Sequence, residues 1–146
     1  MRTERVNRYY CDFCKKSGCS AYHIRRHEER CTLNPGRKCG MPHEMMTTPE
    51  ALEAAVWAIP DVRQFAITTD GDTGDGWTFY SIPDDVVDKT LADLEDRLDG
   101  CPVCVYSALR QAGWAGFITD KFDLEERIAA YWSDVNQEED RYSYGY

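Results

Sequence analysis

The residues best suited to chemistry are three cysteines and a histidine near the start of the chain. Cys11 and Cys14 are separated by two residues, His27 and Cys31 by three, and twelve residues lie between the two pairs. Side chains four residues apart on a helix share one face, and two thiolates on a tight turn can face them. Thiolates and imidazoles in this arrangement bind zinc tetrahedrally. The sequence therefore predicts a zinc site formed by these four residues.

His23 adds a competing ligand to this pattern. His23, His27 and Cys31 follow one another at intervals of four, so all three would lie on one stripe of a helix. A tetrahedral ion cannot accept all three together with both upstream cysteines. The twelve-residue interval favours His27 with Cys31 over the alternative pair His23 and His27. We therefore expect His23 to lie on the surface.

Two apolar residues around the ligands support a finger fold. Tyr9 lies two residues before the first cysteine, and Ile24 lies three residues before the histidine. Residues 9–31, called the finger below, resemble a Cys-Cys-His-Cys variant of the two-Cys two-His zinc finger. This resemblance implies that Tyr9 packs beneath the metal and that Ile24 is a core residue. Gly18 departs from the family, which has a large apolar side chain there. We expect the gap to be filled by Phe13, Cys19 or Tyr22.

A second set of cysteines permits three interpretations. Cys39 and His43 are separated by three residues, and Cys101 and Cys104 by two. These four could form a second zinc site that joins the end of the finger to a distant part of the chain. Alternatively, Cys101 and Cys104 could pack as small apolar residues on a buried helix face. A redox pair is disfavoured, because it should follow a strand, whereas this one follows a predicted helix and a glycine.

Charge divides the chain into two unlike parts. The 146 residues carry a net charge of −9, yet residues 1–44 have ten basic and five acidic side chains, and residues 45–146 have seven and 21. The first part is therefore +5 and the second −14, which indicates different partners or mutual attraction. The residues after Met1 contain no apolar run of the kind that a secretory leader has, so we expect no secretory route, and no run approaches the roughly 20 apolar residues of a membrane span. We expect a cytoplasmic protein with reduced cysteines.

The remaining pattern predicts an α+β fold, with the small finger followed by a mainly helical domain that contains one β-hairpin. We expect a basic arm, the finger and an exit loop over residues 1–47, an acidic helical domain over 48–136 and a loose tail over 137–146. Thr48 as N-cap and Pro49 at the first position predict one helix. Three more are predicted by apolar periodicity and turn residues, beginning at Asp84 or Asp85, at Cys101 and at Asp123.

The hairpin is predicted over residues 63–82. Aromatic and β-branched residues flank an acidic, glycine-rich turn at 70–76. An EF-hand loop would need an oxygen ligand at Gly74, a glycine at Asp75 and a glutamate at Ser81. Because none of these conditions is met, we expect a turn and no calcium site.

Short motifs along nearly the whole chain resemble a group of small bacteriophage proteins. The resemblance rests on the first Cys-x2-Cys pair and on residues 25–28, 31–41, 101–111 and 132–136. It implies phage origin and zinc binding. That group has a cysteine after Gly-Met, whereas this chain has Pro42, so that His43 would be the substitute ligand.

Two functions remain open. No metalloprotease motif, phosphate-binding glycine loop or nucleophile elbow is present, so we expect a binding protein rather than an enzyme. The first hypothesis is a regulator that binds a host protein through complementary charge. The alternative is a nucleic-acid-binding module, in which Ser20, His23 and Arg26 occupy the base-contacting positions of the finger helix. The basic residues that would assist binding to nucleic acid are Lys15, Lys16 and Arg25.

Overall fold

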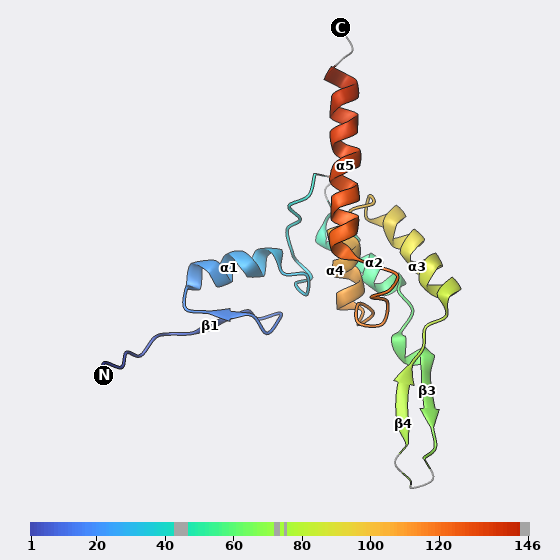
Figure 1. The fold of residues 1–146 in the computed structure, drawn as a ribbon, viewed down its shortest axis with the longest axis horizontal. Helices are drawn as coiled ribbons and strands as arrows, with labels where there is room; N and C mark the ends of the chain where they lie inside the picture. The colour runs from blue at the N-terminus through green and yellow to red at the C-terminus, as the bar shows by residue number, and fades with distance from the viewer. Residues whose placement is uncertain (43–46, 72–73, 75, 144–146) are drawn as a thin grey trace.

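The computed structural model describes residues 1–42, 47–71, 74 and 76–143, and the side chains of these residues up to 136. Over these residues the chain forms five α-helices, one 3-10 helix and two antiparallel sheets of two strands each. The finger lies at one side of the helical domain, and the basic arm extends away from it (Figure 1). The predicted α+β fold is confirmed.

The finger consists of a small hairpin and one helix. Strands β1 (Tyr9–Tyr10) and β2 (Ser17–Gly18) pair antiparallel, and helix α1 (Ala21–Arg30) follows them. A Cβ atom on Gly18 would lie 3.6 Å from the Ile24 Cδ1 atom. The missing side chain thus lets Ile24 pack directly onto the strand.

The prediction that a second side chain fills the gap at Gly18 is therefore wrong. Ile24 occupies the space, and the three residues predicted to fill it are exposed: Phe13, Cys19 and Tyr22. Tyr9 is also exposed on the hairpin and lies outside the buried cluster of the finger among the described residues.

Helix α4 (Pro102–Gln111) lies at the centre of the helical domain. It contacts α2 (Pro49–Ala58), α3 (Asp84–Arg97) and α5 (Leu124–Ser143). Helices that are apolar on several faces are buried on several faces, and α4 buries residues around its circumference: Pro102, Cys104, Val105, Ser107, Ala108 and Leu109. The core is completed by large side chains from α3 and from the segment after α4: Leu94, Leu98, Trp114, Ile118 and Phe122.

Two predicted helix starts are confirmed by their capping hydrogen bonds. The Thr48 hydroxyl accepts from the Ala51 N–H (3.2 Å), and Pro49 occupies the first turn of α2. The Asp123 carboxylate accepts from the Glu126 N–H (3.0 Å) at the start of α5. Each side chain satisfies a backbone donor that has no partner within the helix.

The second hairpin is shorter than predicted. Its strands are β3 (Ala66–Thr69) and β4 (Trp77–Tyr80), with Ile67 paired to Phe79. Residues 63–65, predicted to begin the first strand, instead belong to a 3-10 helix (Val62–Phe65), which the Asp61 carboxylate caps by accepting from the Arg63 N–H (2.9 Å). All eight strand residues are exposed, and the hairpin projects from the helical domain (Figure 1). Part of its turn lies outside the described residues.

Helix α5 is longer than predicted. The tail was expected to be irregular from Gln137, whereas the backbone remains helical to Ser143. Glutamine, glutamate and arginine in this stretch favour a helix, and no glycine or proline interrupts it before that residue. Across the described parts of the chain, none of the helices has the length and hydropathy required to cross a membrane.

Candidate functional site

Two ligands of the predicted zinc site lie in the turn between β1 and β2. The Cys11 N–H donates to the Lys16 carbonyl (2.9 Å), which closes the turn around the two cysteines. The Lys16 N–H points back at the Cys14 Sγ atom (3.4 Å). Both thiols therefore face the helix, and an N–H group is already directed at one sulfur.

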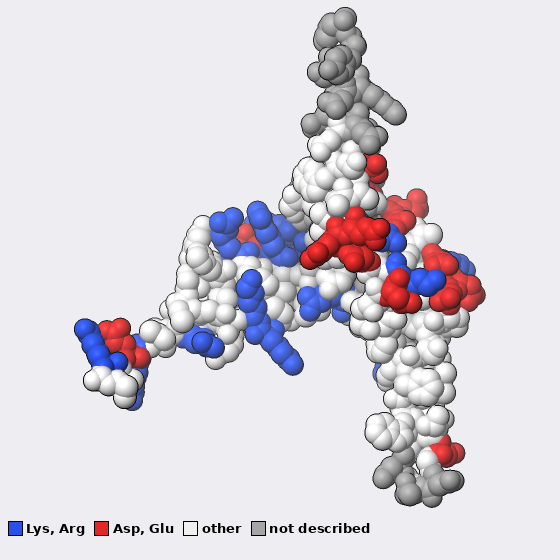
Figure 2. Space-filling model, viewed as in Figure 1, with Lys and Arg blue, Asp and Glu red and all other residues white. Residues whose placement is uncertain are grey.

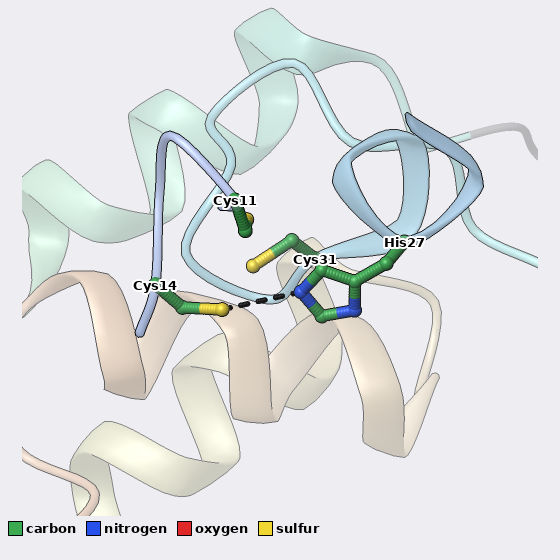
Figure 3. Close-up of side chains that lie close together, drawn as sticks. All are labelled: Cys11, Cys14, His27 and Cys31. Carbon is green, nitrogen blue, oxygen red and sulfur yellow. Dashed lines mark hydrogen bonds between the residues drawn. The ribbon is translucent and has the colours of Figure 1, made fainter. Parts of the chain in front are cut away.

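Helix α1 supplies the other two ligands. His27 lies in its last turn, and Cys31 lies one turn further on at its end. The side chains of Cys11, Cys14, His27 and Cys31 point toward a common centre (Figure 3), and their ligand atoms all lie within 4.8 Å of one another. The Cys14 Sγ atom is 3.1 Å from the His27 Nε2 atom. These four residues, called the first metal group, could hold a metal ion, whereas His23 is exposed and lies outside the group.

Two polar side chains hold the turn and the helix together. The Glu28 carboxylate accepts from the Asp12 N–H (3.0 Å) in the cysteine turn. The Asn34 amide donates to the Glu28 carbonyl (2.7 Å), and its oxygen accepts from the Gly36 N–H (2.8 Å). The bond from Gly36 forms a turn at residues 34–36. The sequence does not predict that Glu28 binds the cysteine turn, because a glutamate on a helix ordinarily points into solvent.

Two thiols of the first metal group, those of Cys14 and Cys31, differ in acidity. The Lys16 N–H, aided by His27, lowers the pKa of Cys14 to about 7. Burial raises the pKa of Cys31. Only the thiolate is a metal ligand, so Cys14 is close to its binding form at neutral pH while Cys31 must lose a proton when metal binds.

We expect the affinity of the first metal group for zinc to rise with pH, because protons and metal compete for the same sulfurs. Below the Cys14 pKa of about 7, both Cys14 and Cys31 must release protons, whereas above it only Cys31 of these two must do so. Competition titrations against a chromophoric chelator from about pH 6 to 8 should thus show a steeper rise in the lower half of the range. A constant affinity would contradict this prediction.

A second group of thiols lies where the chain leaving the finger meets helix α4. The sulfur atoms of Cys39, Cys101 and Cys104, called the second metal group, all lie within 4.8 Å of one another and could hold a metal ion. The Cys39 and Cys101 sulfurs are 3.7 Å apart. A disulfide would require about 2.05 Å, whereas the sulfurs of a tetrahedral zinc site with bonds of about 2.3 Å are about 3.8 Å apart. His43, predicted as the fourth ligand, lies outside the described residues.

The environment of α4 bears on the three interpretations of this group. Cys101 and Cys104 are both buried at the start of the helix. Hydrogen bonds with Cys104 and Cys39, together with burial, raise the pKa of Cys101. For Cys104, the hydrogen bond with Cys101 lowers the pKa, but the hydrogen bond with Cys39 and burial raise it, and the net effect is a raised pKa. A redox pair needs an exposed helix start and a thiolate of low pKa, so this interpretation is not supported.

The exit loop, residues 32–42, runs along α4 in the opposite direction. Near the end of the helix, Arg110 donates to the Thr32 hydroxyl (2.8 Å) and Gln111 donates to the Thr32 carbonyl (3.1 Å). Near its start, the Arg37 Nη1 atom lies 3.7 Å from the Cys104 sulfur. These contacts fix the loop on the helical domain. Sequence patterns do not predict them, because the partners lie far apart in the chain.

The residues predicted to contact nucleic acid have different environments. Ser20 is half-buried and caps α1 by accepting from the His23 N–H. The other five are exposed on the finger: Lys15, Lys16, His23, Arg25 and Arg26. Figure 2 shows lysine and arginine gathered mainly on the finger, and aspartate and glutamate mainly on the helical domain. The charge division seen in the sequence is therefore a division in space.

Comparisons with models of protein families, with curated proteins and with solved structures found no match for this chain. The observations that bear on function are thus the two metal groups, their junction at α4 and the exposed face of the finger. The first metal group has the complete donor set of a closed site, with four protein ligands. Closed tetrahedral sites are structural, whereas catalytic zinc sites keep one position open.

Proposed function

We propose that this protein is a zinc-binding accessory protein of bacteriophage type that regulates a host protein by binding to it. The observation that carries the proposal is the convergence of Cys11, Cys14, His27 and Cys31 within 4.8 Å on a finger that presents an exposed helix. Three thiolates and an imidazole are a donor set that zinc prefers. The metal would hold the finger rigid, so that little conformational entropy is lost when a partner binds.

The outer face of α1 has the composition of a protein interface. Tyr22 is 61% exposed, and the Arg26 guanidinium lies 5.9 Å from the centre of its ring. Tyrosine and arginine are enriched at the centres of interfaces, where a few residues contribute most of the binding free energy. An acidic surface on the partner would complement the finger. A nucleic acid is negative along its whole length and would be repelled by the acidic helical domain, whereas a protein can confine its acidic surface to the contact with the finger.

The nucleic-acid alternative is favoured by one observation, the exposure of Lys15, Lys16, His23, Arg25 and Arg26 on the same small finger. Arginine and lysine can neutralise phosphates, and such binding weakens steeply as salt increases. Salt dependence therefore separates the two functions.

The test is a Tyr22→Ala/Arg26→Ala double variant, with Tyr10→Ala on the finger's hairpin as the matched control. We expect the double variant to keep its zinc and to bind a captured host protein about 30-fold more weakly, as for a loss of about 2 kcal/mol at an interface centre. The control should bind as the wild type does. Binding to oligonucleotides that strengthens at low salt and is lost in the double variant would instead establish the alternative. Equal binding of all three chains would contradict both.

A further inference from the structure

Arg37 is a buried cation beside the second metal group. The residue is only 7% exposed, although it lies in the exit loop. Its Nη1 atom is 3.7 Å from the Cys104 sulfur, and its Nε atom has no hydrogen-bond partner among the described residues. Over the same residues, no carboxylate forms an ion pair with Arg37. Among the side chains that the structure describes, the polar contact of this positive charge is therefore with the thiol of Cys104, a member of the second metal group.

A buried guanidinium needs a negative charge nearby. Arginine stays protonated in proteins, and removing an isolated charge from water is costly unless an opposite charge and hydrogen bonds compensate. Three neutral thiols would provide only weak hydrogen-bond acceptors. Three thiolates bound to a divalent ion would provide a centre with one net negative charge, provided that the fourth ligand is neutral.

We propose that Cys39, Cys101 and Cys104 bind a zinc ion as three thiolates, and that Arg37 is the counter-charge that completes this centre. The inference rests on the proposed zinc chemistry of the protein and assigns a charge balance to its second site. A neutral fourth ligand such as an imidazole leaves the centre at −1, which Arg37 neutralises. A fourth thiolate or a carboxylate would give the centre a net charge of −2, which the single positive charge of Arg37 would not neutralise.

The placement of these residues gives the second centre a structural role. Arg37 and Cys39 belong to the exit loop, whereas Cys101 and Cys104 belong to the start of α4. The metal and its counter-charge therefore join the same two segments. Side chains around a metal site that orient or balance its ligands usually contribute about 10–100-fold to metal affinity.

The test uses the full chain titrated with Co²⁺ and Zn²⁺ in three variants. Arg37→Met removes the charge, Arg37→Lys keeps it, and Arg110→Met is the matched control. Arg110 also ties the exit loop to α4, by its bond to Thr32, but has no thiol partner among the described residues. We expect two tetrahedral metal sites per wild-type chain. Arg37→Met should lower the metal affinity of the second site by about 10–100-fold, whereas Arg37→Lys and Arg110→Met should keep the affinity of the wild type.

The first metal group provides an internal reference in each variant, because it shares no ligand with the second. An Arg37→Met variant that binds the second metal as tightly as the wild type does would overturn the inference, and so would either of two further outcomes. One is a single metal per wild-type chain that Cys31→Ser removes, which would leave the finger proposal standing. The other is an equal weakening in Arg37→Met and Arg110→Met, which would show that Arg37 only fastens the loop. Absence of metal from both sites would instead contradict the proposed function itself.

Discussion

Replacement of Cys31 by serine is expected to release the metal of the finger and to unfold residues 9–31. The buried cluster of the finger consists of Cys11, Ile24 and Cys31, with Cys14 and Leu33 packed against it. Cys11, Cys14 and Cys31 in this cluster belong to the first metal group, so little apolar surface remains to hold the fold without an ion. Structural zinc sites in peptides of this size contribute about 10–16 kcal/mol at neutral pH, far more than one aliphatic side chain provides.

The helical domain should survive this change, because its core is a separate cluster built around α4. Metal analysis and hydrogen exchange of the Cys31→Ser protein would show one metal fewer and fast exchange confined to the finger. Cys19→Ser is the matched control, since Cys19 is exposed and belongs to neither metal group. A Cys31→Ser protein that keeps its full metal content would refute the ligand assignment.

Trp114→Ala is expected to have the largest effect on the helical domain. Trp114 is 0% exposed, its indole N–H donates to the Pro60 carbonyl (2.8 Å), and the ring of Phe65 contacts it edge-on. Truncation of a buried tryptophan costs about 3–5 kcal/mol, and here it also leaves a carbonyl without its donor. A domain of this size has about 5–15 kcal/mol of stability in total.

Denaturant unfolding followed by circular dichroism would measure this loss as a lower midpoint. Trp57→Ala is the control, because Trp57 is 81% exposed and its removal should change the free energy of unfolding by less than about 0.5 kcal/mol. Similar losses in the two variants would show that Trp114 does not anchor the core as described.

The features that the sequence predicts correctly are local ones. The four candidate ligands lie within one hairpin and one helix, and they converge because strand turns and helical periodicity determine their directions. The N-caps Thr48 and Asp123 act on residues three positions away. The 3-10 helix at 62–65 shows the limit of such patterns, since residues 63–65 are predicted to begin a strand but lie in a short helix capped by Asp61.

The features that the sequence does not predict depend on residues far apart in the chain. Arg37 would ordinarily be placed on the surface, whereas it is buried beside Cys104, which is 67 residues away in the sequence. Ile24 covers Gly18 because the glycine has no side chain, an arrangement that a family pattern with a large residue cannot indicate. The direction of the exit loop along α4 likewise depends on Arg110 and Gln111.

The path of the exit loop along α4 also sets an order in which the metals can be acquired during synthesis. All ligands of the first metal group lie between Cys11 and Cys31, so the finger can load its ion soon after it leaves the ribosome. Cys39 is 62 residues from Cys101, and Thr32 is 79 residues from Gln111. A metal at the second group would therefore have to wait until α4 has been translated, whereas the first group would be complete before the helical domain to which the exit loop binds has been made.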